Sequence, residues 1–123
     1  MYDKELALEI LKQIKGAIEK IQKRFKPLKS HEEFTHSDYG MEKLDAICMQ
    51  LIAIGESLKN IDKITNNALL ARYDQVEWKK VKGLRDVISH HYFDVNAEAI
   101  FKICDKQLAP LLNAIDQIIE DIA

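Results

Sequence analysis

The chain has 123 residues and a formal net charge of −2; 47% of its residues are hydrophobic and 31% are charged. This composition is too apolar for a disordered chain and too charged for an integral membrane protein, so it indicates a single globular domain over residues 1–123. The small negative charge excludes a surface that binds nucleic acid nonspecifically over its whole area, and it leaves room for a local basic patch.

The N-terminal sequence and the two cysteines indicate the compartment. Acidic residues occupy the N-terminus, where a signal peptide would be basic and then apolar, and no run of 18 apolar residues occurs. Cys48 and Cys104 both fall within apolar helical patterns, so we expect buried, reduced thiols rather than a disulfide. The sequence therefore predicts a cytoplasmic protein with no membrane segment.

Apolar residues recur with helical spacing along almost the whole chain. The first predicted helix starts at Asp3 as its N-cap and ends before Pro27. A loop follows, and then Thr35 or Ser37 caps a second helix whose apolar positions extend to Ile61. Because these apolar positions cover a wider part of the helix surface than contact with one helix would bury, we expect the second helix to pack on more than one neighbour.

The second half of the chain contains two more predicted helices. A polar interval with one helical turn in the sequence ALLARY leads to a third helix at about residues 75–90. Its predicted buried residues are Trp78, Val81, Leu84, Val87 and Ile88. Asn96 caps a fourth helix, and Pro110 inside its apolar pattern predicts a kink or a lost backbone hydrogen bond. The fold class is thus all-α: a four-helix up-and-down bundle with a possible short extra helix.

Metal and nucleotide motifs are missing from the sequence. His31 and His36 fall in a loop, His90 and His91 are adjacent, and there is no HExxH, EF-hand or paired CxxC spacing. The four glycines do not cluster as a P-loop or a dinucleotide-binding turn requires. We therefore expect no metal and no cofactor.

The stretch GLRDVISHHYFDVN, residues 83–96, closes the third predicted helix with Arg85, two histidines and Tyr92. On an unbroken helix Arg85 and His90 would point about 140° apart, so they share a site only if the helix ends near His90. The aromatic and β-branched residues that follow the histidines, together with Asp94 and Asn96, indicate that the helix ends there. On composition alone these side chains also fit a structural role, as an ion pair, partners of the helix dipole and a half-buried anchor.

The order Arg85, Asp86, three further residues, His90, His91 and Tyr92 resembles the RX4HXY motif of HEPN-domain ribonucleases of the HepT type. The segments AIGESLKNI, WKKVKGLRD and QLAPLL also resemble parts of that family, so the resemblance extends over nearly the whole chain. His91 would satisfy an RX5H spacing, but only His90 leaves a tyrosine two residues later. We therefore take His90 as the motif histidine.

This resemblance implies a HEPN four-helix bundle that acts as a homodimer, with the two motifs meeting at the interface. It implies a ribonuclease toxin of a toxin–antitoxin pair, whose cognate antitoxin is a small MNT-type nucleotidyltransferase. In that family the partner can transfer AMP to the motif tyrosine, which in this chain is Tyr92. Added bulk and negative charge at a site for a polyanion would silence it.

The chemistry of RNA cleavage fits these residue types. RNA carries its own nucleophile, the 2′-hydroxyl, so cleavage needs a proton acceptor, a proton donor and a cation, and no metal. Arg85 is suited to hold the scissile phosphate, and His90 to act as general base or acid. Tyr92 can donate a hydrogen bond to phosphate. Asp86 is expected to orient Arg85 or a histidine, with a solvating role as the alternative.

Further residues are expected to support the motif. Residues 72–85 carry five cations against two acids, so Lys79, Lys80 and Lys82 are candidate RNA-binding residues. Glu56 either pairs with Arg85 or is simply exposed. Two other functions stay open: a non-catalytic helical module that binds a nucleotidyltransferase, and a dimeric bundle whose polar motif only stabilises the interface.

Overall fold

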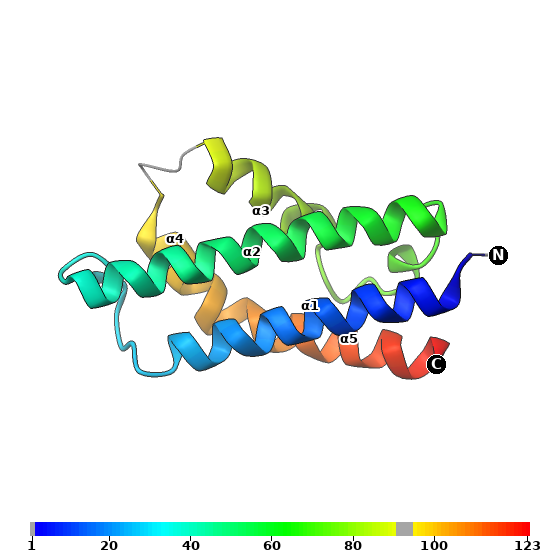
Figure 1. The fold of residues 1–123 in the computed structure, drawn as a ribbon, viewed down its shortest axis with the longest axis horizontal. Coiled ribbons are helices and arrows are strands. Elements are labelled where there is room, and N and C mark those ends of the chain that lie inside the picture. Colours follow the sequence, from blue (N-terminus) through cyan, green and yellow to red (C-terminus); the bar gives the residue numbers. More distant parts are fainter. Residues whose placement is uncertain (1, 91–94) are drawn as a thin grey trace.

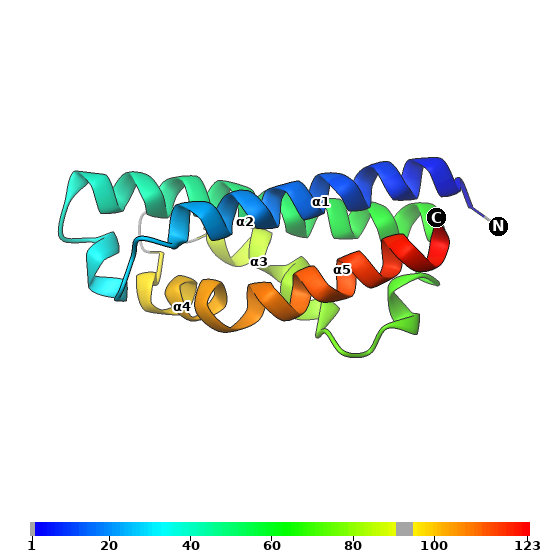
Figure 2. The ribbon, with the colours of Figure 1, turned by 90° about the horizontal axis from the view of Figure 1, so that it is seen from below.

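The computed structural model describes residues 2–90 and 95–123, with residues 89 and 90 described by their backbone only. Its helices are α1 (Lys4–Phe25), α2 (Asp38–Thr65), α3 (Trp78–His90), α4 (Ala97–Lys102) and α5 (Leu108–Ile122), and no strand occurs in this described part. α1 and α2 form a long antiparallel pair, α3 packs against α2, and α5 lies along α1 (Figures 1 and 2). The prediction of an all-α helical bundle is confirmed. None of the described helices is long and apolar enough to cross a membrane.

Side-chain caps fix the N-terminal ends of three helices. Asp3 accepts a hydrogen bond from the backbone N–H of Leu6 at 3.0 Å, and Asn96 accepts one from Ala99 at 3.0 Å. Of the two candidate caps of α2, Ser37 is the one used, since its hydroxyl accepts from the N–H of Gly40 at 2.9 Å. These helix starts agree with the sequence prediction.

Two short 3₁₀ helices flank α2. The predicted turn in ALLARY is present as η2 (Leu70–Arg72), whereas η1 (His31–Phe34) lies inside the segment predicted as a loop. η1 approaches α2 so closely that a Cβ on Gly40 would lie 1.7 Å from the carbonyl oxygen of Glu33. A glycine is therefore required at position 40 for this contact.

The predicted fourth helix is divided by a π-helical turn, η4 (Ile103–Gln107), into α4 and α5. In this turn the N–H of Leu108 donates to the carbonyl of Ile103, five residues earlier. Pro110 then falls in the first turn of α5, where a missing backbone N–H costs little. The irregularity expected at Pro110 is thus a π turn placed just ahead of it.

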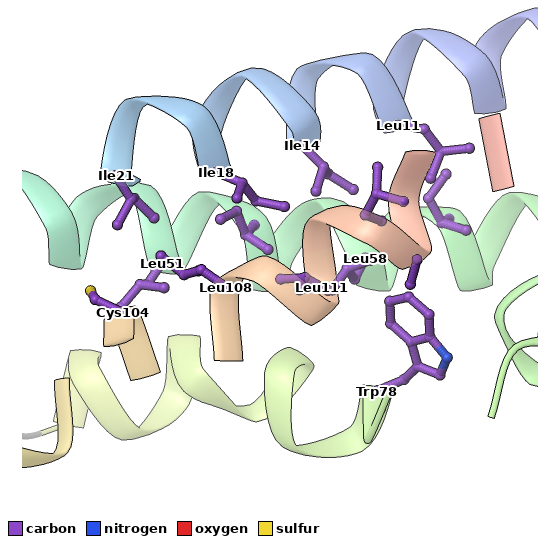
Figure 3. Packing of buried hydrophobic residues seen from close by; sticks show 14 of the residues in the cluster. Leu11, Ile14, Ile18, Ile21, Leu51, Leu58, Trp78, Cys104, Leu108 and Leu111 are labelled. Atoms are coloured by element: carbon purple, nitrogen blue, oxygen red, sulfur yellow. The ribbon is translucent and has the colours of Figure 1, made fainter. Parts of the chain in front are cut away.

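The hydrophobic core lies mainly between α1, α2 and α5, and α3 adds Trp78 and Ile88 to it. Figure 3 shows Leu11, Ile14, Ile18 and Ile21 of α1 near Leu108 and Leu111 of α5, with Leu51 and Leu58 of α2 completing the layer. Trp78 reaches into this core, and its indole N–H donates to the carbonyl of Tyr73 at 2.6 Å. This contact anchors the start of α3.

The prediction that Val87 of α3 is buried is wrong. Val87 is 60% exposed, whereas its neighbour Ile88 is 2% exposed. The physical reason is that α3 packs chiefly against α2, so its buried arc is narrower than the arc of its apolar residues. The side of α3 that carries Val87 is turned to solvent.

The two cysteines are free and buried, as predicted. Burial raises the pKa of the Cys48 thiol to about 11 and that of the Cys104 thiol to about 12. Both side chains are therefore protonated at neutral pH and act as small apolar core residues.

A hydrogen bond ties the segment before α3 to the C-terminal helix. The Tyr73 hydroxyl donates to Oδ2 of Asp121 at 2.7 Å, and burial, together with this bond, raises the pKa of Tyr73. We expect Tyr73→Phe to lower the free energy of unfolding by about 1 kcal/mol, because one hydrogen bond is lost. Urea unfolding followed by circular dichroism measures this change. Tyr39→Phe is the control, since Tyr39 is 57% exposed; an equal loss in both variants would contradict the prediction.

Candidate active site

α3 crosses α2 at close range, and Gly55 makes this possible. A Cβ on Gly55 would lie 3.2 Å from the carbonyl oxygens of Val81 and Lys82 and 3.5 Å from Cβ of Arg85. Any larger side chain at position 55 would push the two helices apart. Gly55 therefore sets the distance at which α3 holds Arg85 beside α2.

Charged side chains of both helices meet at this crossing. Nε of Arg85 lies 3.3 Å from a carboxylate oxygen of Glu56 on α2, and Nη1 of Arg85 lies 3.2 Å from Oδ1 of Asp86. The other oxygen of Asp86 lies 3.6 Å from Nζ of Lys59. The pairing of Glu56 with Arg85, one of two alternatives left by the sequence, is thus present, in an alternating chain of four charges.

The position of Arg85 leaves it partly open to solvent. Its side chain is 46% exposed, and Nη2 takes part in neither of the two carboxylate contacts. The hydrogen bond from Arg85 and the positive charge of Lys59 lower the pKa of Asp86 below its ordinary value. Asp86 is accordingly ionised throughout the physiological range and can pair with Arg85 over that range.

The histidine half of the motif is only partly described. The backbone of α3 extends to His90, and the His90 side chain, His91 and Tyr92 lie outside the described residues. The convergence of Arg85 and His90 on one site therefore stays a prediction. So do the supporting roles of His91 and Tyr92 and the AMP acceptor role of Tyr92.

The three candidate RNA-binding lysines differ in their surroundings. Lys82 forms a partly buried ion pair with Asp62 of α2, which joins the two helices. Lys80 pairs with Glu77 at 2.8 Å on the exposed surface. Lys79 is exposed and makes no ion pair with another residue of the described chain. Of the three, Lys79 is the one whose charge is most accessible to a phosphate.

A groove of about 260 Å³ runs beside the N-terminal half of α3, between that helix, α2 and the π turn. Its floor is apolar, with Leu51, Ile54 and Leu84, and Lys80 and Lys106 also line it. Arg85 is not among the lining residues. The candidate site is thus the open surface at the α2–α3 crossing rather than this groove. Among the side chains described in residues 2–88 and 95–123, no three His, Cys, Asp or Glu are grouped as metal ligands.

A comparison with known protein families shows to which family the chain belongs. The model of the ribonuclease HepT-like family matches residues 14–118 of the chain. The chain belongs to this HepT-like family. The match includes α2, α3 and the described part of the Arg85 motif.

Curated relatives are similar to part of the chain. A protein of Methanocaldococcus jannaschii named "Putative RNase" is 38% identical over 77 residues, which are 63% of this chain and 60% of the relative. A protein of Caldanaerobacter subterraneus subsp. tengcongensis with the same descriptive name is 31% identical over 75 residues, 61% of this chain and 63% of the relative. The chain thus spans about three fifths of the length of these relatives. No solved structure matches it.

One member of the charge network was missed by sequence reasoning. Lys59, which contacts Asp86, lies three residues after Glu56 and therefore on the same side of α2. That spacing was visible in the segment GESLK. The sequence did not show from which direction α3 crosses α2. That direction brings Glu56 and Lys59 to face Arg85 and Asp86.

Proposed function

We propose that this HepT-like protein is a metal-independent endoribonuclease. In this proposal the 2′-hydroxyl of RNA attacks the adjacent phosphorus, the bond to the 5′-oxygen breaks, and the products carry a 2′,3′-cyclic phosphate and a 5′-hydroxyl. The family match over residues 14–118 and the descriptive names of the curated relatives support RNA as the substrate. The position of Arg85, half-exposed at the α2–α3 crossing, is the observation that carries the proposal.

Arg85 is the proposed phosphate-binding residue. Its two carboxylate contacts fix the plane of the guanidinium group, and Nη2 remains for a phosphate oxygen. A cation held in place before the substrate arrives stabilises the charge that develops on the phosphate without reorganising during the reaction. Glu56 and Asp86 are therefore the proposed positioning residues of Arg85.

His90 is the proposed general base or acid, because imidazole exchanges protons near neutral pH. In a homodimer the His90 residues of the two subunits would reach one shared active site. One would accept the proton of the 2′-hydroxyl, and the other would donate a proton to the leaving oxygen. Tyr92 would donate a hydrogen bond to phosphate. Lys79, Lys80 and Lys82 would guide the strand, with binding that weakens as salt rises.

The biological setting forms the finer part of the proposal. The protein would act in the cytoplasm as the toxin of a toxin–antitoxin pair. A cognate MNT-type nucleotidyltransferase would neutralise it, either by transferring AMP to Tyr92 or by covering the site. Both routes act on the same surface, because modification and occlusion each keep the RNA backbone away from Arg85.

Cleavage of a synthetic RNA in the presence of a chelator tests the proposal. We expect the wild-type chain to cut a single-stranded RNA in EDTA and to leave a 2′,3′-cyclic phosphate, which mass spectrometry of the fragments identifies. Replacing the 2′-hydroxyls of the substrate by 2′-O-methyl groups should stop cleavage, since the nucleophile is blocked. Equal cutting of the methylated substrate would rule out this mechanism.

The alternative is a non-catalytic helical module that binds a nucleotidyltransferase. In such a module the two carboxylate contacts of Arg85 would be structural ion pairs without a role in catalysis. This alternative predicts tight association with the nucleotidyltransferase and no cleavage of any RNA pool. The same chelator assay therefore separates the two functions.

A further inference from the structure

The acid-free stretch that contains the most cations in the chain lies away from the Arg85 motif. Residues 20–29 contain no acid and five cations, which are Lys20, Lys23, Arg24, Lys26 and Lys29. Residues 72–85, by comparison, carry five cations over a longer stretch together with two acids. The basic segment comprises the end of α1 and the residues that follow it. A segment with several cations and no acid attracts polyanions.

One cation of this segment lines a hollow between two helices. Arg24 of α1 and Tyr39, Glu42, Lys43 and Ala46 of α2 surround a space of about 270 Å³. Nη1 of Arg24 is buried and has no hydrogen-bond partner within the described part of the chain. The rest of the Arg24 side chain is partly exposed and lines the hollow, and no carboxylate of the described residues forms an ion pair with it, so an anion that enters the hollow meets an unpaired positive charge.

The second feature of the hollow is an exposed aromatic ring. Tyr39 is 57% exposed, and the Lys43 ammonium lies 5.2 Å from the centroid of its ring. Single-stranded nucleic acids bind to surfaces of this composition, because bases stack on the aromatic ring while cations contact the backbone phosphates. A free anion or an acidic peptide would use the cations but has no base to place on Tyr39.

We infer that Arg24, Tyr39 and Lys43, together called the Tyr39 patch, bind single-stranded RNA at a distance from the motif. A base stacks on Tyr39 and a neighbouring phosphate contacts Arg24 and Lys43. The inference rests on the proposed function for the identity of the ligand. The end of α1, the start of α2 and the C-terminal end of α3 lie toward the same end of the molecule (Figures 1 and 2).

Glu42 provides a charge test within the patch. Its carboxylate lines the same hollow and opposes an incoming phosphate. It forms no ion pair with Arg24 or Lys43 in the described chain. Glu42→Gln should therefore tighten RNA binding severalfold, whereas loss of the two cations should weaken it.

Fluorescence anisotropy with a labelled 12-nucleotide 2′-O-methyl RNA, which the protein cannot cleave by 2′-hydroxyl attack, measures binding by the patch. Tyr39→Ala should raise the Kd about tenfold, and Tyr39→Phe should leave it unchanged because the ring is kept. The double variant Arg24→Gln/Lys43→Gln should lower the slope of log K against log salt by about 1.4, the value for two phosphate contacts on a single strand.

A matched control keeps the change in net charge but moves it along α1. Lys4→Gln/Lys12→Gln removes two exposed lysines nearer the other end of that helix and should leave the salt slope unchanged. Circular dichroism and thermal melting of each variant verify the fold. If Tyr39→Ala binds as tightly as the wild type, or if both double variants lower the slope equally, the inference is wrong. Equal competition by polyglutamate would likewise overturn it, since the site would then be a general anion site.

The cleavage assay separates this inference from the proposed function. If the wild type cuts RNA but every Tyr39-patch variant binds the oligonucleotide as the wild type does, the inference fails and the nuclease proposal stands. If binding depends on Tyr39 but no RNA is cut, the nuclease proposal fails and the inference stands. Absence of binding by the wild type overturns the inference directly.

Discussion

Arg85→Ala is expected to reduce the rate of RNA cleavage by about three orders of magnitude while the chain keeps its helical content. Removing one preorganised group that stabilises the charge of a transition state costs roughly 10² to 10³ in rate, and Arg85 contributes a full charge as well. The fold should tolerate the change, because Arg85 is 46% exposed and exposed ion pairs contribute little to stability.

Initial rates on a fluorescent RNA in EDTA measure the effect, and circular dichroism reports the helical content. Arg85→Lys should retain part of the activity, since it keeps the charge and loses the planar fork that contacts two oxygens. His90→Ala should lower the rate by roughly 10² to 10⁴, as expected for loss of a general acid or base. His91→Ala tests the alternative RX5H spacing at the adjacent position.

Three outcomes would contradict this assignment. Equal cleavage by wild type and Arg85→Ala would indicate a contaminating nuclease. A loss of activity in His91→Ala with normal activity in His90→Ala would move the catalytic role to His91. A large drop in the melting temperature of Arg85→Ala, with loss of helical content, would favour a structural ion pair with Glu56 and Asp86.

The features that sequence reasoning predicted well are local ones. The caps at Asp3 and Asn96 depend on a side chain and a backbone N–H three residues apart, so the sequence alone contains both partners. Pro110 indicated an irregular fourth helix for the same reason. The form of that irregularity, a π turn ahead of the proline, depends on how α5 packs on α1, and no local pattern specifies it.

Features that depend on the contact between helices were predicted less well. Val87 was expected in the core because it is apolar, but only the crossing of α3 over α2 decides which arc of α3 is covered. The Tyr39 patch was missed for a related reason. Arg24 and Lys43 lie on two helices, and their charges come together only when α1 and α2 pack side by side.

The Glu56–Arg85 pair stands between these cases. Glu56 follows Gly55 in the sequence, and a small residue within a helix allows a neighbouring helix to approach closely. The structure contains that contact at 3.3 Å. The sequence thus indicated where a close helix approach was possible, and it left the pairing of Glu56 and an exposed Glu56 as two alternatives.

Gly55→Val is expected to lower both stability and cleavage. The added side chain would meet the carbonyl oxygens of Val81 and Lys82, whose distance to a Cβ at this position is already only 3.2 Å. We expect a loss of about 1–3 kcal/mol in the free energy of unfolding from overpacking. We also expect a roughly tenfold to hundredfold loss of rate, because a displacement of α3 moves Arg85 away from its productive position. Urea unfolding and the chelator assay measure the two effects.

Two other glycines serve as controls for helix propensity. A Cβ on Gly83 of α3 or on Gly16 of α1 would meet no atom within 4 Å. Gly83→Ala and Gly16→Ala should therefore each stabilise the chain by up to about 1 kcal/mol and leave the cleavage rate unchanged. If Gly55→Val keeps full activity, the α2–α3 distance does not position Arg85 for catalysis. If Gly83→Ala loses as much activity as Gly55→Val, the effect belongs to any change in α3 and not to the crossing itself.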